Sequence, residues 1–154
     1  MTDFVQLGLL RPMIVVISRN GLLVRLVRRA TKGRLEVVVR NGNAPDRELL
    51  SRTKPKLVVF DDAATGKSER IWMLKQIKRF APEAGVLYVS ATHTPQLERL
   101  ARAAGILYYG SFDRSRLAEV VHACTEMLLA RSATPAETNA AEGPAGRGRT
   151  HNAG

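Results

Sequence analysis

The sequence predicts an α/β fold in which helices cover both faces of a five-stranded parallel sheet. Five short apolar segments, rich in Val, Ile and Leu, alternate with five segments whose apolar residues recur at helical spacing. Such alternation produces right-handed βαβ units, and these units build a parallel sheet. Five units within about 120 residues predict a flavodoxin-like three-layer sandwich with five strands and five helices.

The predicted strands are residues 13–17, 35–39, 57–60, 86–89 and 106–109. A short apolar run bounded by polar residues is typical of a strand that is buried on both faces. The third run is the most informative, because Asp61 and Asp62 follow it directly. In open parallel sheets the ligand sites lie beyond the carboxyl ends of the strands, so chemistry should be sought at Asp61.

The first two predicted helices follow strands one and two. In the first, Leu22, Leu23, Leu26 and Val27 lie at helical spacing, with arginines on the other face. The second covers residues 45–52, and its proline and acidic residues in the first turn suit a helix start.

The other three helices carry start or stop signals. Residues 68–80 form the third predicted helix, with Ser68 as its cap. Thr94 followed by Pro95 marks the start of the fourth, and Gly105 follows its end. Residues 115–131 form the fifth.

We therefore divide the chain into an N-terminal extension (1–11), one folded domain (12–131) and a tail (132–154). The tail is rich in Ala, Pro and Gly, and such a composition predicts disorder because it buries little apolar surface. No apolar run reaches the roughly 18 residues that cross a bilayer, and the start of the chain lacks the basic region of a signal peptide. With Cys124 as the single cysteine, these features predict a cytoplasmic protein without disulfides.

The net charge of +10 lies entirely in the predicted domain, because the tail carries two arginines and two glutamates. This excess favours an anionic partner, either an acidic protein surface or a nucleic acid. A merely solvated basic surface explains the charge equally well. Few aromatic residues accompany the basic ones, which weakens the case for binding single-stranded nucleic acid.

Several motifs together resemble the receiver (CheY-like) domain of bacterial response regulators. Residues 54–61 read Lys-Pro-Lys-Leu-Val-Val-Phe-Asp, as the strand that ends in that family's phospho-accepting aspartate does. Gly66 stands five residues later, Ser90-Ala91 follows the fourth strand, and Phe112-Asp113 follows the fifth. The resemblance spans residues 12–131 and implies that Asp61 occupies the phospho-acceptor position.

Three departures from the family pattern concern this same site. Where receivers have adjacent acidic residues that hold a divalent cation, this chain has Ser18 and Arg19, and Mg²⁺ prefers oxygen ligands. Gly110 stands where the family has a lysine. A shorter loop before the fifth strand leaves either Tyr108 or Tyr109 as the family's switch aromatic.

We therefore expect a stand-alone pseudo-receiver that signals by protein–protein contact, with no enzymatic activity, cofactor or metal. Phosphoryl transfer depends on positioning and on charge neutralisation by metal and cationic groups, and here the metal ligands and the lysine are both missing. We expect Asp61 to close the loop after its strand, and we hypothesise that Arg19 pairs with Asp61 or Asp62 and locks one conformation. Ser90 either contacts an anion on Asp61 or satisfies local backbone.

The resemblance also implies a partner or homodimer surface formed by residues 96–103, 106–109 and 115–127. Two other functions stay open: a single-domain response regulator phosphorylated on Asp61, and a basic regulator associated with nucleic acid. Residues 64–68 invite comparison with a phosphate-binding P-loop, but Asp61 holds the place of its first glycine and would repel phosphate.

Overall fold

The computed structural model describes residues 11–42 and 45–148. Its sheet has the order β2-β1-β3-β4-β5, and every neighbouring pair of strands is parallel. The strands are β1 (Met13–Ile17), β2 (Glu36–Arg40), β3 (Leu57–Asp61), β4 (Gly85–Val89) and β5 (Tyr108–Gly110). All five predicted strands are present, although β5 begins two residues later than expected.

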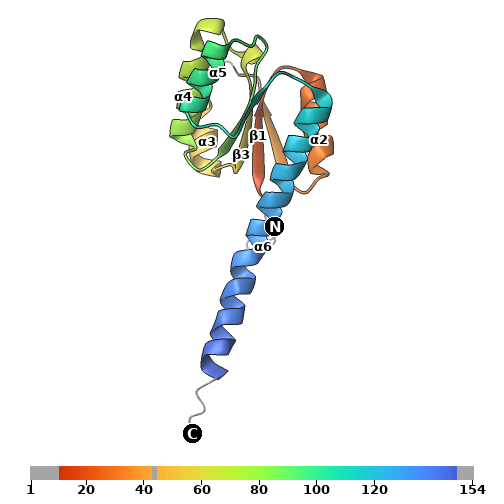
Figure 1. The fold of residues 1–154 in the computed structure, drawn as a ribbon, viewed down its shortest axis with the longest axis vertical. Helices are drawn as coiled ribbons and strands as arrows, with labels where there is room; N and C mark the ends of the chain where they lie inside the picture. The colour runs from red at the N-terminus through yellow and green to blue at the C-terminus, as the bar shows by residue number, and fades with distance from the viewer. Residues whose placement is uncertain (1–10, 43–44, 149–154) are drawn as a thin grey trace.

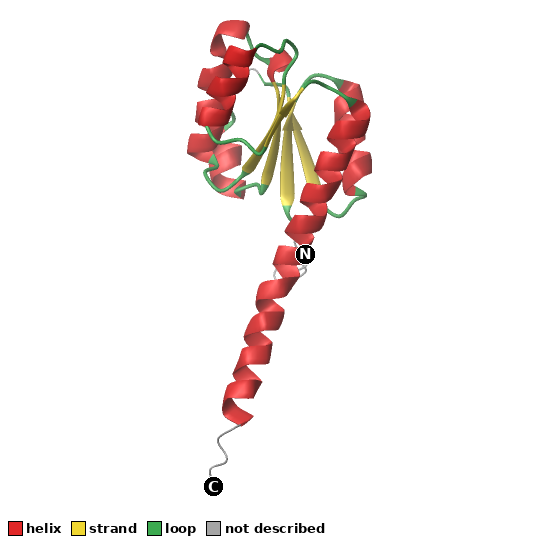
Figure 2. Cartoon of the chain, in the orientation of Figure 1, coloured by secondary structure: helices red, strands yellow, loops and turns green. Residues whose placement is uncertain are grey.

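Five α-helices lie among the described residues, as the sequence predicted. They are α2 (Gly21–Thr31), α3 (Arg47–Thr53), α4 (Arg70–Phe80), α5 (Pro95–Ala103) and α6 (Arg114–Gly148), with two short 3₁₀ turns, η2 (Asp62–Ala64) and η3 (Lys67–Glu69). Helices α2 and α6 cover one face of the sheet, and α3, α4 and α5 cover the other (Figures 1 and 2). The predicted three-layer sandwich is therefore confirmed.

Each face of the sheet packs its own apolar core. The core under α3, α4 and α5 contains Phe60, Leu74 and Tyr88, and that under α2 and α6 contains Val59, Leu23 and Leu117. Strand residues alternate between the two cores because successive side chains of a strand point to opposite faces. The same alternation determines to which face of the sheet each side chain at the end of β3 points.

Local signals explain where two of the helices start. Asn20 accepts a hydrogen bond from Leu22 N at 2.9 Å, and Thr94 Oγ1 accepts one from Leu97 N at 3.0 Å. The expected cap at Ser68 is wrong, since Ser68 lies inside η3 and α4 begins at Arg70.

The carboxyl-terminal part of α6 differs from the sequence-based expectation. The structure continues the helix from Arg131 to Gly148, across most of the segment that we expected to be disordered (Figure 1). The segment contains several alanines, the residue with the highest helix propensity, whereas Pro135 and Pro144 argue against a helix. The N-terminal extension lies outside the described residues except for Arg11, whose Nη1 donates to Gly33 O at 2.8 Å. None of the described helices is long and apolar enough to cross a membrane.

Candidate functional site

Two buried carboxylates stand side by side at the carboxyl end of β3. Asp61 is the last residue of the strand and Asp62 begins η2, and only 6% and 2% of their surfaces are exposed. Because consecutive side chains alternate, they point to different sides of the sheet. Burying a carboxylate is costly unless hydrogen bonds satisfy it, so the partners of each define the site.

Asp61 is held by donors from its own chain. Ser18 Oγ donates to Asp61 Oδ2 at 2.6 Å, and Ala63 N donates to Oδ1 at 3.1 Å. The same Ser18 oxygen accepts from Asn20 N at 3.0 Å, which fixes the hydroxyl at the end of β1. The loop-closing role expected for Asp61 is therefore present, and Ser18 takes part in it.

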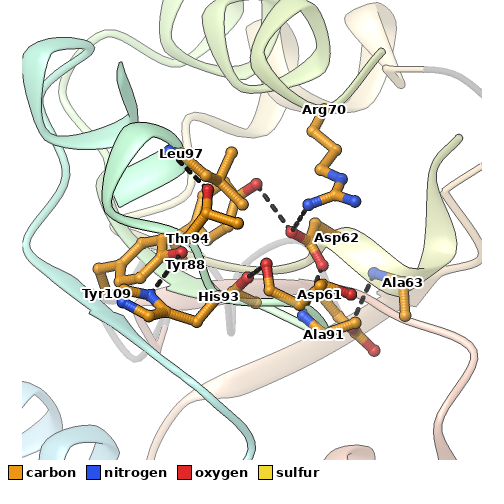
Figure 3. Close-up of polar contacts among 12 residues, drawn as sticks. Asp61, Asp62, Ala63, Arg70, Tyr88, Ala91, His93, Thr94, Leu97 and Tyr109 are labelled. Carbon is orange, nitrogen blue, oxygen red and sulfur yellow. Dashed lines mark hydrogen bonds and ion pairs between the residues drawn. The ribbon is translucent and has the colours of Figure 1, made fainter. Parts of the chain in front are cut away.

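Asp62 is the centre of a second set of contacts, which we call the Asp62 cluster (Asp62, Arg70, Tyr88 and Ala91; Figure 3). Tyr88 Oη donates to Asp62 Oδ2 at 2.9 Å, and Ala91 N donates to Oδ1 at 2.8 Å. Arg70 Nη1, on a side chain only 12% exposed, lies 3.5 Å from Oδ2. The cluster joins the ends of β3 and β4 to the first turn of α4.

Burial raises the pKa of the Tyr88 phenol. Loss of solvent, the neighbouring Asp62 charge and the hydrogen bond to Asp62 raise the Tyr88 pKa well above its ordinary value of 10.0. A neutral phenol is the form that donates to the carboxylate, so the hydroxyl keeps this role at physiological pH.

The two candidate switch tyrosines point to opposite faces of the sheet. Tyr109 is buried, stacks on Tyr88 at 5.3 Å between ring centroids, and has its Oη 3.1 Å from His93 Nδ1. Tyr108 packs instead against the core under α2 and α6. Of the two, Tyr109 is the one in contact with the Asp62 cluster.

A pocket of about 330 Å³ lies beside Asp61. Its lining includes Arg19, Asn20, Asp61, Ser90 and Phe112. The Ser90 hydroxyl donates to Thr92 O at 3.0 Å, so it satisfies local backbone, the second of the two roles considered for it. The structure therefore brings Ser18, Arg19, Asp61 and Ser90 together.

The hypothesis that Arg19 pairs with Asp61 or Asp62 is wrong. Arg19 is exposed, and its Nε donates to Asn41 O at 3.2 Å. The arginine paired with Asp62 among the described residues is Arg70, because the backbone of η3 and the start of α4 bring its side chain over the end of the sheet.

The side chain of Tyr108 lies against Gly110 and limits which residue fits at position 110. A Cβ atom at this position would collide with the Tyr108 ring, which lies against the glycine. A lysine at position 110 would therefore require Tyr108 to move. Within the described part of the chain, no group of three His, Cys, Asp or Glu residues is placed to hold a metal ion.

Sequence reasoning missed Arg70, Tyr88 and His93. Phe60 pairs with Tyr88 in the sheet and Asp62 follows Phe60 by two residues, which places all three on one face, but this pairing of β3 with β4 is known only from the structure. No feature of the sequence indicated that Arg70 contacts Asp62, because this contact depends on the path of the loop between residues 62 and 70.

A parallel sheet ordered 2-1-3-4-5, with an aspartate at the end of β3, defines a flavodoxin-like α/β domain. Solved structures share this fold. A response regulator from Thermotoga maritima has 22% identity and a TM-score of 0.63, over 76% of this chain and 99% of that one. The phosphorylated cyanobacterial phytochrome response regulator has 18% identity and a TM-score of 0.61, over 77% and 94% of the two chains.

An orphan response regulator from H. pylori has 18% identity and a TM-score of 0.59, over 79% of this chain and 96% of that one. No family model and no curated protein matches the sequence. At these identities the likeness establishes the fold: the chain has the response-regulator receiver (CheY-like) fold that the sequence motifs predicted.

Proposed function

We propose that the protein is an atypical receiver-like signalling domain that acts by protein–protein interaction without phosphorylation. The observation that carries this proposal is the set of hydrogen bonds that Asp61 accepts. Both of its oxygens accept hydrogen bonds from the chain itself, and Ser18, one of the donors, stands where receivers have an acidic residue.

The chemistry of phosphoryl transfer supports the proposal. Transfer requires a cation to neutralise the charge that develops on the phosphoryl oxygens, and a Mg²⁺ ion needs several oxygen ligands. Ser18 and Arg19 offer no carboxylate beside Asp61, and Gly110 offers no ammonium group. An Asp61 carboxylate bound by Ser18 and Ala63 therefore serves better as a structural group than as a nucleophile.

The Asp62 cluster supports the same proposal from the other face of the sheet. Asp62 accepts a buried hydrogen bond from Tyr88 Oη and a partly buried one from Ala91 N, and it pairs with Arg70. The carboxylate thereby joins the loops that follow β3 and β4. Buried polar groups are costly to separate from their partners, so the cluster favours one conformation, which a partner protein would recognise.

Treatment with a small phosphodonor and Mg²⁺ tests the proposal. Intact-mass measurement should show no phosphoryl adduct on the wild type, because Ser18, Arg19 and Gly110 supply neither the carboxylates that hold Mg²⁺ nor the lysine that pairs with the phosphoryl group. A double variant, Ser18→Asp with Arg19→Asp, restores carboxylates beside Asp61 and serves as the matched comparison. A wild-type adduct that disappears in Asp61→Ala would contradict the proposal and favour the phosphorylated response regulator.

We further propose that the partner surface is formed by α5, β5 and α6 and that it supports a homodimer. Leu100 on α5 is 47% exposed, and an interface at this surface would remove its apolar side chain from water. Light scattering at tens of micromolar should give the mass of a dimer, and Leu100→Asp should give a monomer because it places a charge in the interface. A wild-type monomer under these conditions would contradict the homodimer.

A further inference from the structure

A second cavity, of about 670 Å³, opens at the amino ends of the strands, at the opposite edge of the sheet from Asp61. Pro12 and Lys56 precede β1 and β3, Gly85 begins β4, and all three line the cavity. On the other side it is closed by α6. Its volume lies within the roughly 300–1,000 Å³ typical of small-molecule pockets.

The wall of this cavity is largely apolar. Leu57 and Cys124 are buried in it, whereas Leu107 is 57% and Met127 44% exposed. Gly85 allows this arrangement, because a Cβ atom there would collide with Leu107. Two large exposed apolar side chains in one hollow form a surface that an apolar group would remove from water.

The rim of the cavity is mainly basic. Lys56, Lys78 and Arg131 line it, against a single acidic residue, Glu83. Lys78 Nζ lies 3.5 Å from Ala84 O, and the end of its side chain lies beside Gly105, whose φ of +92° is a conformation that favours glycine.

We propose that this cavity binds a free single-chain anionic amphiphile, such as a medium-chain carboxylate. The alkyl chain contacts Leu107 and Met127, and the carboxylate lies among Lys56, Lys78 and Arg131. A nucleic acid fits the surface less well, because its charges follow an extended backbone and would leave the apolar wall uncovered. The site is separate from Asp61, although Leu107 and Met127 also fall within the residue ranges of the proposed partner surface.

Calorimetric titration of the full chain with octanoate, decanoate and dodecanoate, each below its micellar concentration, tests the proposal. The affinity should rise roughly fourfold for each added methylene that is buried. Dodecyltrimethylammonium, which has an alkyl chain of similar length and the opposite charge, should not bind. Bound dodecanoate should slow the reaction of Cys124, the only thiol, with a maleimide.

Matched variants locate the site. Met127→Glu and Lys78→Glu should each weaken dodecanoate binding tenfold or more, because the first places a charge on the wall and the second reverses one at the rim. Trp72→Glu and Arg99→Glu change an exposed apolar residue and an exposed cation elsewhere, and should bind as the wild type does.

Three results would overturn the proposal. The first is no saturable binding of dodecanoate, and the second is binding that Met127→Glu and Lys78→Glu leave unchanged. The third is faster Cys124 modification in the full-length Leu7→Asp, Leu9→Asp variant without any amphiphile, which would make the chain's own N-terminal residues the occupant of the cavity.

Discussion

Replacing Asp62 by alanine should lower the free energy of unfolding by about 3–5 kcal/mol, the loss typical of breaking a buried charge pair. The variant removes the acceptor of the Tyr88 hydroxyl and of Ala91 N, and it leaves the largely buried Arg70 guanidinium without its carboxylate. Groups that remain buried without partners account for most of such a loss. Urea unfolding followed by circular dichroism measures it.

Two comparisons separate this effect from a general cost of losing an acidic residue. Glu119 is an exposed carboxylate on α6, and Glu119→Ala should change the free energy of unfolding by no more than about 0.5 kcal/mol. Asp61→Ala should have an intermediate effect, because it removes an acceptor for Ser18 and Ala63 but no ion pair recorded among the described residues. An Asp62→Ala variant as stable as Glu119→Ala would show that the Asp62 cluster does not hold the domain together.

The fold was predictable because its signals are local. Each strand is a short apolar run, and β1 starts and ends at the predicted residues because Met13–Ile17 is bounded by Pro12 and Ser18. Thr94 and Pro95 specify the start of α5 through a hydrogen bond and a fixed backbone angle, both of which depend on adjacent residues alone.

The candidate site was predictable only in part. Asp61 was found because it ends an apolar strand, and its closure of the following loop is a contact between residues two apart. The partner of Asp62 was assigned to the wrong arginine, because Arg19 precedes a helix at the same edge of the sheet, whereas Arg70 reaches the carboxylate through the fold of η2 and η3. Contacts of this kind depend on loop geometry, which the sequence pattern does not encode.

Raising the pH above 10 should remove the stability that Tyr88 contributes. The folded pKa of this phenol lies above the unfolded value of 10.0, so the folded state keeps a proton that the unfolded state loses. Its contribution is therefore complete below pH 10 and declines above it, by about 1.4 kcal/mol for each pH unit until the folded pKa is reached. Tyr88→Phe lacks both the proton and the hydrogen bond to Asp62, and serves as the reference.

At pH 8 the wild type should be more stable than Tyr88→Phe by about 1.5–3 kcal/mol, the usual value of a hydrogen bond to a charged group. Urea unfolding of both proteins at pH 8, 10 and 11.5 should show this difference shrink at the highest pH, since every other ionising group is common to both chains and cancels. A difference that stays constant across the series would mean that Tyr88 ionises as readily in the folded chain as in the unfolded one. In that case the Asp62 cluster would be open to solvent, and the single rigid conformation on which the proposed mode of signalling depends would be lost.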